Sequence, residues 1–102
     1  MTRVIVVLAS SLLMIGCWVK GIDDHMHRFD GWIASTKDER VRELGIPLRC
    51  HQFKTGGEMC EWPYRVGLDA VDTINLSFDG KNTVCSWFYR GFYGERRSQA
   101  TC

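Results

Sequence analysis

The sequence predicts an α+β domain in which two N-terminal helices pack on one face of a three- to four-stranded antiparallel sheet. Residues 22–47 carry helix-capping signals and apolar side chains at helical spacing. Residues 49–89 instead carry apolar side chains that alternate with polar ones, which is typical of half-buried strands. A chain of 102 residues fits one such domain.

The N-terminal segment has the layout of a bacterial lipoprotein signal. Arg3 makes its start positive, and an apolar run follows over residues 4–15. The run ends in Ile15-Gly16-Cys17, which resembles a lipobox, where the signal is cut before a cysteine whose thiol is then acylated. We therefore expect residues 1–16 to be a signal peptide, residues 17–21 a lipidated tether, and residues 22–102 a single domain.

Two other interpretations of this segment stay open. An uncleaved signal anchor needs about 20 apolar residues to span a bilayer, but the apolar run is shorter and contains Ser10 and Ser11. A soluble secreted protein needs a small-x-small cleavage site, which does not follow the run.

Charge limits the class of partner. The full chain has a net charge of +1, and loss of Arg3 with the signal leaves basic and acidic side chains equal in number. Nonspecific nucleic-acid binding depends on neutralising phosphates, so no nucleic-acid partner is expected. The membrane is expected to be contacted through the N-terminal lipid.

The cysteine count agrees with the lipobox, because acylation of Cys17 leaves four of the five cysteines. Four cysteines in an oxidising envelope can form two disulfides. The disulfide candidates are Cys50, Cys60, Cys85 and Cys102. Four free thiols in a cytosolic protein are the alternative, and this alternative leaves the signal unexplained.

Three disulfide connectivities are open. Cys50 and Cys60 close the shortest loop, which favours this pair and leaves the other two cysteines to join the tail to the last strand. A tight turn at Gly56-Gly57 opposes the pair, because it places Cys50 on the other face of the strand or only diagonal to Cys60. The bond then requires Cys50 to lie in the loop before the strand.

The first helix is expected to begin near Asp23 and Asp24, whose carboxylates can accept hydrogen bonds from its free N–H groups. The apolar residues that follow, Met26, Phe29 and Ile33, share one side at helical spacing.

The second helix is expected over residues 37–44. Thr36 and Glu39 have the spacing of a capping box, in which each side chain satisfies a backbone donor. Gly45 suits a C-terminal cap, and Pro47 prevents the helix from continuing.

The strands follow these helices. Residues 49–54 and 58–65 flank the glycine pair, and Pro63 indicates an edge or a bulge because it cannot donate to a ladder. Residues 74–78 and 83–89 flank the turn residues 79–82. The tail, residues 90–102, is expected to be irregular.

These motifs occur in a characteristic order: the capping box, Leu44-Gly45-Ile46-Pro47, Trp62-x-Tyr64, and Ile74-x-Leu76-x-Phe78-Asp79-Gly80. The series resembles the SmpA/OmlA family of small outer-membrane lipoproteins, which includes the assembly component BamE. The resemblance implies a BamE-like unit and a non-enzymatic protein-binding or scaffold role related to outer-membrane protein assembly. It also implies a lipid-anchored domain that faces the periplasm.

Two points qualify what the resemblance implies. Trp18, which follows the acylated cysteine, favours the outer over the inner membrane, because Asp at that position is the usual inner-membrane signal in enteric bacteria. A family of secreted β-lactamase inhibitors uses a similar unit, so a secreted or tethered inhibitor of an envelope enzyme is the alternative function.

The aromatic run near the C-terminus is the candidate partner-binding feature. Alternation along residues 87–89 places at least one ring away from the core, and exposed aromatic rings beside arginine are typical of interface anchors. The candidate partner-binding residues are Trp87, Tyr89, Arg90, Phe92 and Tyr93. Core packing of these rings is the alternative.

No catalytic residue, cofactor or metal site is predicted. Cys50 and His51 are neighbours on a strand and point to opposite faces, so they do not form a Cys–His dyad. His25 and His27 are two positions apart on a helix and point in different directions, which favours a polar helix surface over a metal site. A small-ligand or metal binder is the third alternative.

Overall fold

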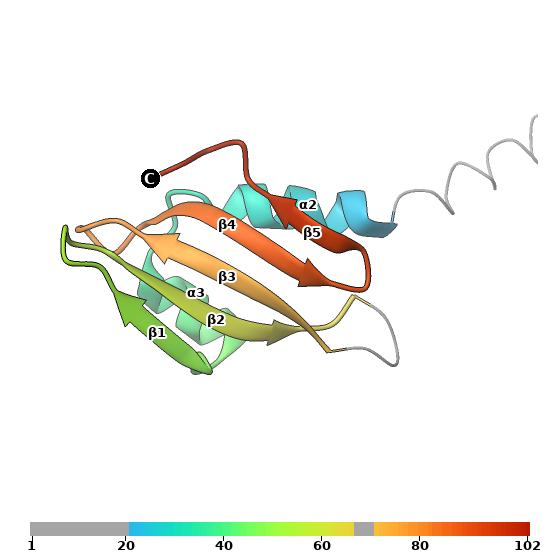
Figure 1. The fold of residues 1–102 in the computed structure, drawn as a ribbon, viewed down its shortest axis with the longest axis horizontal. Helices are drawn as coiled ribbons and strands as arrows, with labels where there is room; N and C mark the ends of the chain where they lie inside the picture. The colour runs from blue at the N-terminus through green and yellow to red at the C-terminus, as the bar shows by residue number, and fades with distance from the viewer. Residues whose placement is uncertain (1–20, 67–70) are drawn as a thin grey trace, which may run out of the picture.

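The computed structural model describes residues 21–66 and 71–102, which form an α+β fold with two helices and a five-stranded antiparallel sheet (Figure 1). The helices are α2 (Gly21–Trp32) and α3 (Lys37–Leu44). The strands are β1 (Arg49–Gln52), β2 (Glu58–Tyr64), β3 (Asp72–Phe78), β4 (Val84–Gly91) and β5 (Gly94–Arg97). Each strand pairs with the next one along the chain, so β1 and β5 form the two edges.

Both helices lie against the same face of the sheet, and the opposite face is uncovered (Figure 1). The core between the two layers contains Phe29 and Trp32 of α2 together with inward-facing residues of the three central strands. These inward residues are Cys60, Trp62, Tyr64, Ile74, Leu76, Phe78, Val84, Trp87 and Tyr89. Cys60, Trp62 and Tyr64 alternate along β2 and therefore share this inward face.

The local signals at α3 are confirmed. The helix covers Lys37–Leu44, and the Thr36 hydroxyl accepts a hydrogen bond from the Glu39 N–H at 3.2 Å. Gly45 ends the helix with φ at +88° and donates its N–H to the Val41 carbonyl at 2.8 Å. The Trp62 indole N–H donates to the Gly45 carbonyl at 2.8 Å, which fastens the end of the helix to the sheet.

The β1–β2 hairpin corrects the expected turn. The Gly56 N–H donates to the Phe53 carbonyl at 3.1 Å, and the Phe53 N–H donates to the Gly57 carbonyl at 3.0 Å. The turn is thus centred on Thr55, before the Gly56-Gly57 pair, and Cys50 pairs directly with Cys60 across the two strands. The Cys50–Cys60 disulfide therefore forms with Cys50 inside β1, not in the loop before it.

Pro63 lies in β2, which is an interior strand of the sheet. The pairing with β1 covers Glu58 to Glu61, so Pro63 lies beyond it on a locally exposed edge. This agrees with the expected edge position, because an edge does not need the missing N–H.

The tail corrects a second expectation. Gly94–Arg97 forms the edge strand β5, paired antiparallel with β4, where an irregular segment was expected. All four residues of β5 are exposed, so they have no apolar alternation that could have indicated a strand. A second disulfide, Cys85–Cys102, ties the end of the tail back to β4. Within the described ranges, no helix is long and apolar enough to cross a membrane.

Candidate functional site on the uncovered sheet face

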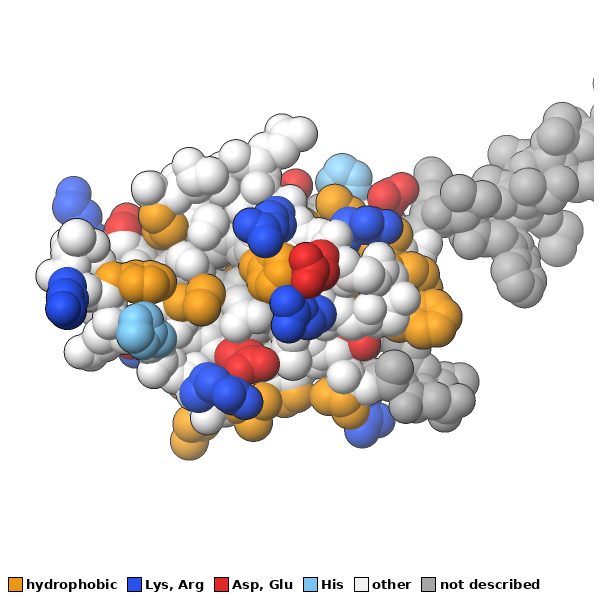
Figure 2. Space-filling view, viewed as in Figure 1, with side chains coloured by type: hydrophobic (Ala, Val, Ile, Leu, Met, Phe, Trp, Pro, Cys, Tyr) orange, Lys and Arg blue, Asp and Glu red, His pale blue; other side chains and the backbone are white. Residues whose placement is uncertain are grey.

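The uncovered face is built from the outward residues of all five strands. Cross-strand pairing places Arg49, Glu61, Asn75, Phe88 and Arg97 in one row across the whole sheet. Figure 2 views this face and shows hydrophobic side chains interspersed with basic and acidic ones. Polar residues are ordinary on the solvated face of an antiparallel sheet, so the aromatic ring in this row is the feature that needs an explanation.

Phe88 lies between two arginines. The Arg97 guanidinium carbon is 4.8 Å from the centre of the Phe88 ring, and that of Arg90 is 5.8 Å away. An exposed cation–π contact of this kind contributes about 0.5–1 kcal/mol. The three side chains therefore form an ordered surface cluster rather than three independent ones.

The ionic partners on this face differ between the arginines. Arg49 pairs with Glu61 at 2.7 Å, and Arg90 pairs with Glu95 at 2.9 Å. Among the described residues, no carboxylate lies within 4 Å of the Arg97 guanidinium. Arg97 is thus an exposed cation, held over an aromatic ring, that can bind a carboxylate or another acidic group.

A hollow of about 310 Å³, here called the tail groove, adjoins this cluster. Its lining includes Met59, Ser77, Ser86, Phe88, Arg97 and Thr101. A second hollow of about 410 Å³ shares Ser77 and Ser86 with it and extends to Phe53 and Gly56 of the β1–β2 hairpin. The two hollows together give the uncovered face a depression that combines hydroxyl groups, apolar side chains, the Arg97 cation and, at the far end, the Asp79 carboxylate.

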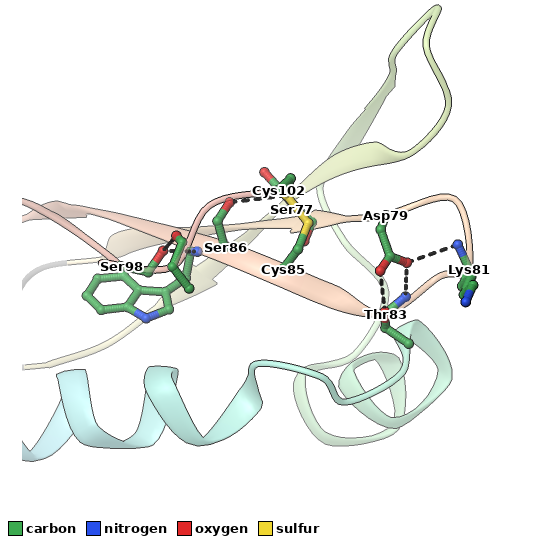
Figure 3. The surroundings of a disulfide bond; sticks show 10 residues. Ser77, Asp79, Lys81, Thr83, Cys85, Ser86, Ser98 and Cys102 are labelled. Carbon is green, nitrogen blue, oxygen red and sulfur yellow. Dashed lines mark hydrogen bonds between the residues drawn. A yellow bond between two sulfur atoms is a disulfide. The ribbon is translucent and has the colours of Figure 1, made fainter.

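The tail forms a wall of this groove because it is held in place at both ends. Ser98 donates its backbone N–H to the Trp87 carbonyl at 3.0 Å, and its hydroxyl accepts the Trp87 N–H at 3.0 Å. At the far end, Cys102 is bonded to Cys85, and its sulfur lies 3.6 Å from the Ser86 hydroxyl (Figure 3). Figure 3 shows this disulfide on the side of the sheet away from the helices.

The structure places two of the five candidate partner-binding residues in the core. Trp87 is 3% exposed, and its indole N–H donates to the Asp30 carboxylate at 2.8 Å. Tyr89 is fully buried, and its hydroxyl donates to the Asp72 carboxylate. Burial, together with that hydrogen bond, raises the pKa of Tyr89 to about 12. These two side chains are therefore not available to a partner.

A bulge in β4 is the physical reason. Ser77 pairs with Ser86 and Phe78 pairs with Val84, so Cys85 is an extra residue in β4. Val84 and Trp87 consequently both face the core although they are three positions apart. Phe88, which sequence reasoning did not single out, is the ring that faces outward. Alternation could have indicated it, because Phe88 lies between Trp87 and Tyr89 in the strand and must face the side of the sheet opposite to theirs.

The remaining candidates separate in space. Arg90 is exposed on the uncovered face beside Phe88. Phe92 and Tyr93 lie at the β4–β5 turn, where Phe92 is 76% exposed and Tyr93 is half-buried. The lipidation candidate Cys17 lies outside the described residues.

The other chemistry-bearing groups have structural partners. Sulfur atoms of Cys50 and Cys60 lie within 4.8 Å of a Glu58 oxygen, but both sulfurs are in the disulfide and Glu58 pairs with Lys37. His25 shares a hydrogen bond with the Tyr64 hydroxyl, whose oxygen is 2.7 Å from Nδ1, whereas His27 is exposed. Burial, with a smaller effect of Arg28, lowers the pKa of His25.

No family model matches this chain, and no curated protein or solved structure matches it at a significant level. Its function must therefore be inferred from its own residues.

Proposed function

We propose that this chain is a non-enzymatic lipoprotein of the bacterial cell envelope whose domain binds another envelope protein. Acyl chains on Cys17 hold it in a membrane, and the uncovered face of the sheet carries the binding surface. The lipobox supports the anchor. Two disulfides support an oxidising compartment, because such bonds are rare in the cytosol.

The observation that carries the binding proposal is Phe88 held between Arg90 and Arg97 on the uncovered face. Aromatic and arginine side chains are enriched among the residues that dominate interface energies, particularly at the centre of an interface. Phe88 lies in the row that crosses the whole sheet, with the tail groove beside it. A partner that offers an apolar group to Phe88 and a carboxylate to Arg97 would complement this surface.

The resemblance to the SmpA/OmlA family supports the outer-membrane protein assembly machinery as the partner. It also supports the outer membrane as the location, with the domain in the periplasm. On this proposal, deletion of the protein perturbs the levels of outer-membrane proteins. An unchanged outer-membrane protein profile would contradict the assembly role while leaving the anchor and the binding surface to be judged separately.

Photocrosslinking in intact cells tests the binding surface directly. A photoreactive amino acid at position 88 should yield an adduct with one envelope protein. The matched control is position 42, because Arg42 is exposed on α3 on the opposite side of the sheet. No adduct at position 88, or the same adduct at both positions, would contradict the proposal.

A tethered inhibitor of an envelope enzyme is the second candidate, and the β1–β2 hairpin favours it. The Cys50–Cys60 bond braces the two strands, and Phe53 is 41% exposed next to the turn. A braced loop loses little conformational entropy on binding, which suits a segment that enters an active site. An inhibitor would form a one-to-one enzyme complex that Phe53→Ala weakens and Phe88→Ala does not, whereas the scaffold role predicts the reverse.

A further inference from the structure

The β4–β5 turn carries two adjacent aromatic residues at its tip. Phe92 and Tyr93 connect Gly91 to Gly94, and their ring centres are 5.1 Å apart in an edge-to-face arrangement. Turn tips usually carry Gly, Pro, Asn, Asp or Ser. Phe92, which is 76% exposed, departs from this pattern, and it stands beside a second aromatic residue.

A buried carboxyl group holds this turn in place. Asp72, which is 3% exposed, accepts the Phe92 N–H at 3.1 Å and the Tyr89 hydroxyl. A side chain at Gly91 would begin only 2.0 Å from the Asp72 carboxyl carbon, so glycine alone fits there. The aromatic pair is thus presented by a well-supported turn rather than by a loose loop.

The turn lies at the end of the molecule where α2 begins (Figure 1). The Tyr93 hydroxyl lies 3.4 Å from the position that a Cβ on Gly21 would occupy. Four residue steps separate Gly21 from Cys17, and each step spans at most about 3.6 Å, so the two Cα atoms are at most about 14 Å apart. An acyl chain on Cys17 would therefore keep this end of the domain at the membrane surface.

We propose that Phe92, Tyr93 and Val71, here called the aromatic tip, form a membrane-contacting surface that enters the lipid interface when Cys17 is acylated. Val71 is 60% exposed and precedes Asp72, whose carboxyl group accepts the Phe92 N–H. Tyr93 combines an apolar ring with a polar hydroxyl, which suits the boundary between lipid and water, and Phe92 and Val71 offer apolar side chains that lipid can accommodate. This inference rests on the proposed lipid anchor.

The orientation that follows is compatible with partner binding. The β1–β2 and β3–β4 turns lie at the end of the sheet away from the start of α2 (Figure 1). With the aromatic tip at the bilayer, that end points into the aqueous compartment, where another envelope protein can reach it. A lipid surface is favoured over a protein as the occupant of the tip because the short tether holds the tip at the bilayer.

Paramagnetic broadening in nanodiscs tests this contact. The acylated mature protein, residues 17–102, is verified by its intact mass and placed in phosphatidylcholine nanodiscs that contain a lipid spin-labelled in its acyl chain. We expect the amide signals of Phe92 and Tyr93 to lose most of their intensity, while those of Thr55 and Gly56 at the other end keep theirs. Equal broadening at both ends, or stronger broadening at Thr55 and Gly56, would overturn the inference.

A matched pair of variants isolates the aromatic contribution. Phe92→Ser should restore much of the Tyr93 signal, whereas Phe53→Ser, which removes an exposed ring at the opposite end, should not. An unchanged Tyr93 loss in Phe92→Ser would overturn the proposed role of this ring. A product without acyl chains would overturn the anchor itself, so that failure is distinct from an acylated protein without selective broadening.

Discussion

At the scale of single residues, Asp72 organises the end of the sheet where β4 turns into β5. Its carboxyl group accepts hydrogen bonds from the Tyr89 hydroxyl and the Phe92 N–H, and its side chain occupies the space over Gly91. The same contacts place Tyr89 in the core and Phe92 at the exposed tip. One buried polar group therefore separates two aromatic residues that are three positions apart into different roles.

The crowding at Gly91 predicts a large effect from a small substitution. Gly91→Ala should lower the free energy of unfolding by about 1–3 kcal/mol, because the new methyl group overlaps Asp72. Gly31→Ala is the matched control, since nothing lies within 4 Å of its Cβ position in α2, and it should raise stability by about 0.5–1 kcal/mol. Urea unfolding measures both; equal effects would contradict the crowding.

His25 predicts a pH dependence of stability. Burial, followed by the nearby Arg28, lowers the pKa of His25, so the folded protein binds this proton less tightly than the unfolded chain. The stabilising contribution is therefore fully present above the unfolded pKa of 6.5 and is lost as the pH falls through the lower folded pKa. His25→Gln should show a shallower loss of stability in that window than the wild type. If the melting temperatures of the wild type and His25→Gln fell equally with pH in that window, His25 would not be the source of the pH dependence.

At the scale of elements, the tail and its disulfide form one wall of the tail groove on the uncovered face of the sheet. β5 has no buried residue, so its position depends on pairing with β4 and on the turn that Asp72 supports. Beyond β5, Ser98 and the Cys85–Cys102 bond hold the chain over the uncovered face. The wall of the groove therefore depends on a covalent link and on the hydrogen bonds of Ser98 rather than on apolar packing.

Removal of the Cys85–Cys102 disulfide should make the tail more mobile without unfolding the domain. Cys85→Ser combined with Cys102→Ser should lower the free energy of unfolding by about 2–4 kcal/mol, since the unfolded chain gains freedom. The Ser98 amide, which donates to the Trp87 carbonyl, should then exchange its hydrogen faster, while the Trp62 amide in β2 changes less. Unaltered exchange at Ser98 would show that hydrogen bonds alone hold the tail.

At the scale of the whole molecule, the helices and the uncovered face divide the domain into a structural side and a surface available to partners. The helices bury Phe29 and Trp32 against the sheet, and the opposite face presents Phe88 and Arg97. The aromatic tip and the start of α2 lie at one end, and the β1–β2 turn lies at the other (Figure 1). A lipid at Cys17 would give these two ends distinct environments.

Acylation is the prediction that belongs to this scale. The intact mass of protein purified from membranes should equal residues 17–102 plus acyl chains, and Cys17→Ser should remove that increment and release the protein from membranes. An unacylated wild-type mass would contradict the anchor and favour a secreted inhibitor over a tethered scaffold.

Local chemistry made part of this protein predictable from sequence. The limits of α3 follow from Thr36 and Gly45, because capping depends on side chains within one turn of the helix end. The shared face of Trp62 and Tyr64 follows from alternation within one strand, which likewise needs no knowledge of the neighbouring strands.

Features that depend on pairing between strands were decided only by the tertiary structure. The turn after Phe53 determines which residue of β1 lies opposite Cys60. The extra residue Cys85 determines that Phe88 faces outward and Trp87 faces the core. Strand β5 is fully exposed and has no alternation of apolar and polar residues, so it forms only because it pairs with β4. The limits of α3 and the inward faces of β2 and β3 were predictable from the sequence alone, because caps and alternation act within a few residues. The tertiary structure decided register, the bulge and the uncovered face, because those depend on hydrogen bonds between segments far apart in the chain.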